Sequence, residues 1–125
     1  MILVVGGAYQ GKLAFARGLC PGTEWIDGRT CQEEELFGCG GVHHFHAYIE
    51  GQLRKGQPVR QLAGRIADEN PEIVIVSDEI GYGIVPVDAF DREYRETAGR
   101  ICTELAVYAD KVYRVVCGLG LMLKG

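Results

Sequence analysis

The chain has 125 residues, of which 47% are hydrophobic and 24% charged, with a formal net charge of −4. This size and composition predict a single folded domain over residues 1–125 with a hydrophobic core. The negative charge argues against a nucleic-acid partner, whose binding depends on a basic surface that neutralises phosphates. We find neither an apolar run of the roughly 20 residues that a membrane helix needs nor a signal-peptide pattern. Five scattered cysteines without a Cys-x-x-Cys pair complete the expectation of a cytoplasmic protein with reduced thiols and no membrane partner.

The chain begins with a predicted strand over Met1–Val5, a glycine-rich loop and a predicted helix over Leu13–Leu19. The loop reads Gly-Gly-Ala-Tyr-Gln-Gly-Lys-Leu and has the Walker A spacing of Gly6, Gly11 and Lys12. In such a loop the backbone N–H groups and the positive end of the helix dipole face phosphate oxygens, although Leu13 stands where Walker A has a hydroxyl for Mg²⁺. The alternative is a tight turn with a surface lysine. The predicted nucleotide-binding residues are Gly6, Gly7, Ala8, Tyr9, Gln10, Gly11, Lys12 and Leu13.

The middle of the chain continues the alternation of strands and helices. A short strand over Glu24–Ile26 ends at Asp27, and an acidic segment, Thr30–Phe37, has the composition of one or two helical turns. After the predicted loop over Gly38–Gly41, we expect helices over Val42–Lys55 and Val59–Glu69. Pro58 suits the first turn of the second of these helices.

The last third of the chain holds the clearest strand, Glu72–Ser77, because a run of branched apolar residues is typical of a parallel strand buried on both faces. A predicted loop over Asp78–Val87 leads to a long helix over Asp88–Ala109, with Asp88 as its N-cap. Lys111–Cys117 is a further predicted strand. The expected core face of the long helix carries Phe90, Tyr94, Ala98, Ile101, Leu105 and Tyr108. The alternation as a whole predicts an α/β three-layer sandwich around a mostly parallel sheet.

Ligands of such a sheet bind at the carboxyl ends of its strands. We therefore expect Gly6–Lys12, Asp27 and Ser77–Glu79 to be neighbours in space. An acidic residue at the end of an apolar strand is how P-loop proteins hold Mg²⁺. Asp27 and the pair Asp78 and Glu79 are the candidates for this role, and the alternative for each is a carboxylate that caps a turn.

The segment Ser77–Pro86 carries a resemblance to a known family. It reads Ser-Asp-Glu-Ile-Gly-Tyr-Gly-Ile-Val-Pro and resembles the S-N-E-V-G-x-G-I-V-P signature of adenosylcobinamide kinase/adenosylcobinamide-phosphate guanylyltransferase. The similarity continues from Arg92 to Lys124, and the opening Ile2–Lys12 fits the family's V-T-G-G-x-x-S-G-K start. Asp27–Thr30 is similar to the family's V-D-C-L-T strand end, which favours Asp27 as the magnesium ligand.

The resemblance implies a RecA-like P-loop NTPase fold and an enzyme of the cobalamin pathway. Members of this family phosphorylate the aminopropanol hydroxyl of adenosylcobinamide and then transfer GMP from GTP to the new phosphate. The implied cofactors are ATP or GTP and Mg²⁺, the implied acceptor is a corrinoid, and the implied assembly is a homo-oligomer, with a trimer as the family tendency. The catalytic residues would be Lys12, Asp27 and Glu79.

The chain departs from the family pattern in three places. Leu13 replaces the Walker hydroxyl, Asp78 replaces an asparagine, and Leu19–Ile26 is too short for the family segment whose histidine carries GMP. Two classes of function remain open. One is a phosphotransferase that acts on a corrinoid hydroxyl without guanylyl transfer, and the other is a non-catalytic nucleotide-binding protein of regulation or assembly.

All three histidines, His43, His44 and His46, fall at the start of a predicted helix, four to seven residues after Cys39. They are candidates for a Cys/His metal site or for a replacement guanylyl acceptor. Because they follow the predicted magnesium-site strand rather than precede it, we expect no covalent guanylyl intermediate. The alternative is that they are partly exposed imidazoles at a helix start, without a functional role.

Overall fold

The computed structural model describes residues 1–80 and 88–125. Residues 81–87, which hold most of the family signature and of the predicted loop, lie outside the described residues. The elements in chain order are β1 (Ile2–Gly6), α1 (Lys12–Leu19), β2 (Trp25–Asp27), α2 (Glu33–Leu36), β3 (Gly41–His43), α3 (Phe45–Arg54), α4 (Leu62–Glu69), β4 (Val74–Asp78), α5 (Ala89–Tyr108), β5 (Lys111–Val116) and β6 (Leu119–Lys124). None of the helices within these two ranges has the length and hydrophobicity needed to cross a bilayer.

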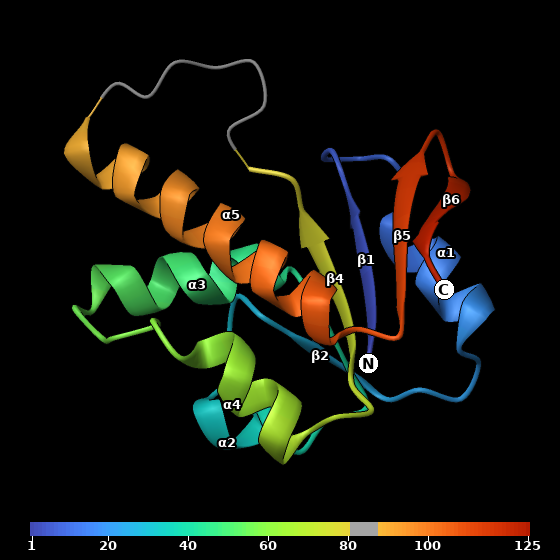
Figure 1. Cartoon of the computed structure of the whole chain (residues 1–125), viewed down its shortest axis with the longest axis horizontal. Helices are drawn as coiled ribbons and strands as arrows, with labels where there is room; N and C mark the ends of the chain where they lie inside the picture. The colour runs from blue at the N-terminus through green and yellow to red at the C-terminus, as the bar shows by residue number, and fades with distance from the viewer. Residues whose placement is uncertain (81–87) are drawn as a thin grey trace.

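The strands form one six-stranded sheet in the order β2-β3-β4-β1-β5-β6 (Figure 1). The first five strands are parallel, and β6 pairs antiparallel with β5. The predicted α/β fold around a mostly parallel sheet is therefore confirmed. In the β1–β4 register, Gly6 lies opposite Asp78, so the glycine loop begins beside the carboxyl end of β4.

Helices cover both faces of the sheet. On one face, α1 packs Ala16 against Val4 and Val115, all three fully buried. On the other face, α3, α4 and α5 lie together in Figure 1 and bury the larger core. Both faces of the central strands are thus removed from water, which explains why β4 begins with three consecutive apolar residues, Val74, Ile75 and Val76. The larger core includes Phe45, Ile49, Ile66, Ile75, Ile101 and Leu105, each with no exposed surface.

The sequence-based prediction is wrong where the loop over Gly38–Gly41 meets the helix over Val42–Lys55. The structure has a strand, Gly41–His43, and the helix begins only at Phe45. A strand of three residues is too short to show an alternating pattern, while Phe45, Ile49 and Leu53 have helical spacing. Gly41 is required here because a Cβ would lie 2.8 Å from the Trp25 ring.

Two further expectations need correction. Helix α4 begins at Leu62 rather than Val59, because Leu62 N–H first closes a three-residue turn onto the Val59 carbonyl. No element was predicted after Gly118, yet β6 returns along β5 through a two-residue turn. Cys117 (φ 51°) and Gly118 (φ 75°) both have positive φ, as tight hairpin turns require.

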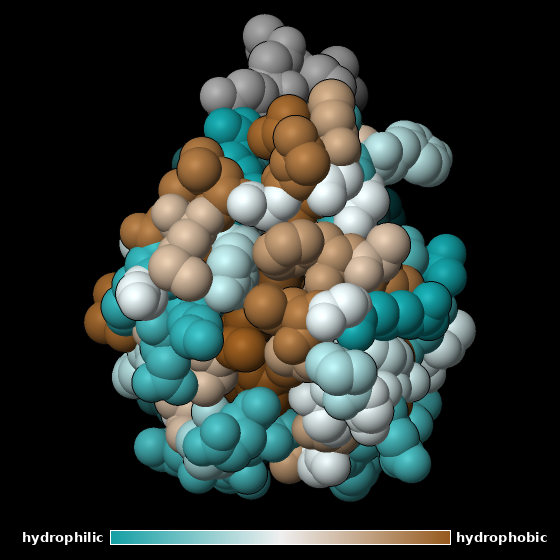
Figure 2. Space-filling model, turned by 90° about the vertical axis from the view of Figure 1, so that its right-hand side faces the viewer, coloured by the Kyte–Doolittle hydropathy of each residue, from teal (hydrophilic) through white to brown (hydrophobic). Residues whose placement is uncertain are grey.

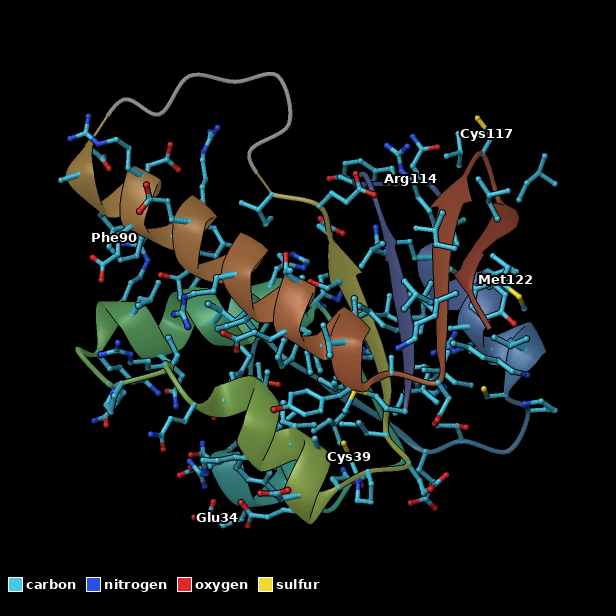
Figure 3. All side chains as sticks on the ribbon, in the orientation of Figure 1. Glu34, Cys39, Phe90, Arg114, Cys117 and Met122 are labelled. Atoms are coloured by element: carbon cyan, nitrogen blue, oxygen red, sulfur yellow. The ribbon has the colours of Figure 1, made fainter. Side chains whose placement is uncertain are left out.

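The long helix α5 follows its prediction closely. Asp88 is its N-cap and accepts a hydrogen bond from Asp91 N–H at 2.7 Å. Phe90 is half-buried and lies between α5 and α3 in Figure 3, with Arg54 Cζ 4.4 Å above its ring. Tyr108 was expected in the core but is 52% exposed, because the helix ends there and the buried Ala109 begins the turn into β5.

Candidate functional site

The glycine loop is held in place by the hairpin that joins β5 to β6. Gln10 accepts two hydrogen bonds of 2.7 Å from this hairpin, one from Cys117 N–H to its side-chain oxygen and one from Gly118 N–H to its carbonyl. Gly11 is the N-cap of α1 with φ 86°, a conformation that favours glycine, and Tyr9 also has positive φ. The loop is therefore a fixed feature of the carboxyl edge of the sheet.

Lys12 lies almost completely buried at the base of this loop, with 8% of its side chain exposed. Its Nζ lies 2.6 Å from Asp78 Oδ1 and donates a 2.7 Å hydrogen bond to the Gly7 carbonyl. A buried ammonium needs a nearby anion or hydrogen-bond acceptors. Asp78 supplies this negative charge, and the Gly7 carbonyl supplies an acceptor.

A pocket of about 380 Å³ opens above this pair. Its walls come from the loop, the start of α1 and the ends of β3 and β4. The lining residues are Ala8, Tyr9, Gly11, Lys12, Leu13, Ala14, His43, His44, Val76 and Asp78. Five of the eight predicted nucleotide-binding residues therefore line one pocket together with a buried cation. The arrangement can hold a polyanion.

Glu79 lies on the other flank of the glycine loop. Its backbone N–H donates to the Gly6 carbonyl at 2.9 Å, and its carboxylate accepts from Arg114 Nε at 2.9 Å. With Gly7 and Gln10, this pair lines a separate pocket of about 180 Å³. Figure 3 shows Arg114 at the same end of the sheet as Cys117. Glu79 and Lys12 are thus close along the sheet edge but do not line the same pocket.

Asp27 is placed farther from the loop than the sequence predicts. Strand β2 is at the edge of the sheet, separated from β1 by β3 and β4, a displacement of roughly 14 Å at the usual strand spacing. Arg29 donates to both Asp27 carboxylate oxygens, with its Nη2 2.7 Å from Oδ2. These hydrogen bonds lower the pKa of Asp27 to about 2. Asp27 does not line the pocket that contains Lys12.

His46 is a residue of this site that the sequence does not single out from its neighbours. Its Nδ1 accepts a 3.0 Å hydrogen bond from Asp78 N–H, and its Nε2 lies 3.5 Å from Asp78 Oδ2. Burial lowers the pKa of His46, an effect that the nearby Asp78 carboxylate opposes. The neutral ring with its proton on Nε2 satisfies both contacts. Only the pairing of β3 with β4 brings these residues together, so no local pattern could have revealed the contact.

The fold and the pocket define an α/β protein with a lysine-bearing glycine loop at the carboxyl edge of a mostly parallel sheet. The model of the family described as cobinamide kinase / cobinamide phosphate guanyltransferase matches residues 23–123. The chain belongs to this family, as its resemblance to the family predicts. The match begins after the glycine loop.

Two curated relatives are similar over part of the chain. The bifunctional adenosylcobalamin biosynthesis protein CobU of Salmonella typhimurium is 43% identical over 53 residues. The protein of the same name from Escherichia coli is 42% identical over the same number of residues. Each alignment covers 42% of this chain but only 29% of the relative. The chain therefore spans less than a third of the length of either relative in these alignments.

Proposed function

We propose that the chain is a RecA-like P-loop nucleotide-binding enzyme that transfers a phosphoryl group from ATP or GTP to a hydroxyl of a corrinoid such as adenosylcobinamide. The observation that carries this proposal is the buried Lys12, paired with Asp78 in a pocket formed by the glycine loop. Family membership supports a kinase or nucleotidyltransferase of cobalamin biosynthesis. The Salmonella and Escherichia relatives are named as adenosylcobalamin biosynthesis proteins, which is consistent with a role in this pathway.

In this proposal the triphosphate replaces Asp78 as the partner of Lys12. Phosphate oxygens would take hydrogen bonds from Lys12 Nζ and from backbone N–H groups of the loop. Asp78 would then be released toward the acceptor, where a carboxylate can orient a hydroxyl for attack. His46 is positioned to hold Asp78, because it contacts both the backbone and the side chain of this residue.

Glu79 is proposed to act on the acceptor side of the loop. A pocket of about 450 Å³ extends from Asp78 and Glu79 along α5, and most of its lining residues are apolar. Ile80, Ala98 and Leu123 are among them. Such walls would contact an apolar part of a large acceptor, most of which would lie outside a pocket of this volume.

Among residues 1–80 and 88–125, those around the loop do not form a complete set of ligands for Mg²⁺. The ion would neutralise charge on the transferred phosphate, and it prefers oxygen ligands. Leu13 offers no hydroxyl and Asp27 lies outside the pocket, so Asp78, once released from Lys12, is the one carboxylate among the described lining residues. Mg²⁺ at Asp27 stays a prediction from the sequence, and we derive no catalytic step from it.

Guanylyl transfer is a second candidate function, favoured by one observation. His43 and His44 line the same pocket as Lys12. Their position after strand β2 in the sequence therefore does not keep them away from the proposed nucleotide pocket. An imidazole nitrogen that attacks the α-phosphorus of GTP would form an N–P bond, expel pyrophosphate and lose its ring proton to solvent. The sequence-based prediction remains that no such adduct forms.

This second candidate is tested by incubation with GTP labelled at the α-phosphate, followed by denaturation and intact-mass measurement. Unmodified protein would uphold the sequence-based prediction. One acid-labile GMP per chain that is lost in His43→Ala or His44→Asn would instead establish guanylyl transfer.

We also propose that the protein is a homo-oligomer that uses the β6 edge. Leu119, Leu121, Met122 and Leu123 are 48–76% exposed, and Figure 2 shows apolar surface gathered on this side of the molecule. An exposed apolar edge strand is prone to pair with another chain. Light scattering should show an oligomer, with a trimer as the family expectation. Leu121→Lys should shift the mass toward a monomer, and a monomeric wild-type protein would contradict this proposal.

The main proposal is tested by calorimetric titration with ATP and GTP, with and without Mg²⁺. Lys12→Ala should weaken binding at least about tenfold, a loss of 1.4 kcal/mol or more, because the cation at the centre of the pocket is removed. Lys55→Ala is the matched control, since Lys55 is exposed at the end of α3 and should leave affinity unchanged. Equal affinities for the wild type and Lys12→Ala would refute the site.

Turnover separates the enzyme from a non-catalytic nucleotide-binding protein of regulation or assembly. Phosphorylated adenosylcobinamide should accumulate when ATP or GTP is supplied, and Lys12→Ala should abolish it. Tight nucleotide binding without any product would favour the non-catalytic alternative.

A further inference from the structure

We propose that Asp27, His43 and His44 form a binding site for a transition-metal dication of the Zn²⁺ class. The three residues each offer a ligand atom, and these atoms lie within 4.8 Å of one another. Nδ1 of His43 and Nδ1 of His44 are 2.6 Å apart and share a hydrogen bond, and a bound ion would replace this hydrogen bond and separate the two nitrogens to about 3.3 Å. The residues come from two adjacent strand ends, Asp27 from β2 and His43 from β3, and from the N-cap of α3.

The backbone around the cluster is fixed before any metal binds. Gly28 N–H donates to the His43 carbonyl at 2.8 Å, which ties the end of β2 to the turn before α3. A Cβ at position 28 would lie 2.3 Å from the His44 carbonyl oxygen, so only glycine permits this approach. His44 has φ 53° and ψ 39°, a left-handed conformation that is uncommon for histidine. Such strain often marks a functional position, and here it brings the two rings together.

The donor atoms indicate the class of metal. Two imidazole nitrogens and one carboxylate suit Zn²⁺, Co²⁺ or Ni²⁺, whereas Mg²⁺ prefers oxygen ligands. Three protein ligands leave one position open on a four-coordinate ion. Because His43 and His44 also line the pocket of Lys12, an ion held by them would lie at the border of that pocket. The expectation of Mg²⁺ at Asp27 thus has a competing assignment with a different ion.

Arg29 is the neighbour that opposes a metal at this site. Its guanidinium donates three hydrogen bonds of 2.7–3.0 Å to the Asp27 carboxylate. Its side chain is 57% exposed, so it can turn into solvent when a cation arrives. Removing its charge should then strengthen metal binding. If Asp27 instead serves only to hold Arg29, the same change should have no such effect.

The test is calorimetric titration of the 125-residue chain, with its thiols reduced, using Zn²⁺ alone. One equivalent should bind to the wild type. Asp27→Asn and His44→Asn should each weaken binding at least about tenfold, the lower limit seen when even an outer-shell partner of a metal site is lost. Asparagine tolerates the left-handed conformation and is a good N-cap, so His44→Asn keeps the backbone intact. Arg29→Gln should bind Zn²⁺ more tightly than the wild type.

Zinc also binds thiolates, and Cys31 is close enough to Asp27 for their charges to interact. Cys31→Ser is therefore the matched control and should retain the full equivalent of Zn²⁺. Co²⁺ in place of Zn²⁺ should give visible d–d bands without a thiolate charge-transfer band. No zinc binding by the wild type, undiminished binding in Asp27→Asn and His44→Asn, or loss of binding in Cys31→Ser would each overturn the proposal. These measurements need no nucleotide, so their failure would leave the proposed function untouched.

Discussion

Asp27 and Asp78 both lie at the carboxyl ends of parallel strands, yet their surroundings differ. Asp78 ends β4 and lies 2.6 Å from the buried Lys12. Asp27 ends β2 and is paired with Arg29, which is 57% exposed. The position of each strand explains the contrast, because β4 pairs directly with β1 while β2 is the far edge strand. A carboxylate at a strand end therefore reaches Lys12 only when its strand lies beside the glycine loop, and Asp27 on the far strand meets Arg29 instead.

The largest expected difference between the two aspartates is in stability. Asp78→Asn leaves the Lys12 ammonium buried without a carboxylate and should lower the free energy of unfolding by about 1–3 kcal/mol. Asp27→Asn removes the partner of Arg29, whose side chain is 57% exposed and stays hydrated, and should change the free energy of unfolding by less than about 1 kcal/mol. Urea denaturation of the ligand-free protein measures both changes. Equal losses of unfolding free energy in the two variants would mean that burial does not determine how much an ion pair contributes to stability.

The second difference concerns binding of nucleotide in the absence of metal. Asp78→Asn removes the anion that competes with phosphate for Lys12, and should tighten ATP binding in EDTA by up to about tenfold. Asp27→Asn should leave the affinity unchanged, because Asp27 lies outside the pocket. Titration calorimetry in EDTA compares the two variants with the wild type. A weaker affinity in Asp78→Asn would show that Asp78 assists phosphate binding instead.

The third prediction uses pH to probe the histidine that supports Asp78. Burial lowers the pKa of His46 below its usual value of 6.5, so the unfolded chain binds its proton more readily than the folded chain does. This contribution to stability is present above about pH 6.5 and decreases as the pH falls toward the folded-state pKa. His46→Gln should flatten the dependence of Tm on pH between about 7 and 5. An unchanged slope would assign the dependence to other groups, such as His43, whose pKa burial also lowers.

The smallest expected effect is at Leu13, beside Lys12 in the pocket wall. Leu13→Ser restores a Walker hydroxyl and should tighten Mg²⁺-nucleotide binding by less than about tenfold. Binding in EDTA should not change, since the hydroxyl serves the metal. Leu13→Ala is the matched control, because it shortens the side chain without adding a ligand. If the serine and alanine variants behave alike, either another group supplies the ligand or the loop binds nucleotide without metal.

Several features could be predicted from the sequence because their signals are local. Glycine spacing before a lysine, placed between an apolar run and a helical pattern, was sufficient to predict the loop that now surrounds Lys12. Branched apolar residues predicted β4, and Asp88 predicted the start of α5. The family itself was recognised from a contiguous signature that begins at Ser77, and the family model confirms it.

The tertiary structure alone decided which strand ends meet. Strand order depends on backbone pairing between distant segments, and hydrogen bonds of N–H and C=O groups carry no side-chain signature. For this reason the sequence favoured Asp27 as the carboxylate of the site. In the structure, Asp78 is the carboxylate that pairs with Lys12, and His46 contacts Asp78. The left-handed backbone of His44 and the hairpin at Cys117 and Gly118 were not predicted either, because a positive φ at one or two positions leaves no repeating pattern in the sequence. The glycine loop could be predicted from adjacent residues, whereas the residues beside it are determined by the pairing of strands that are distant in the sequence.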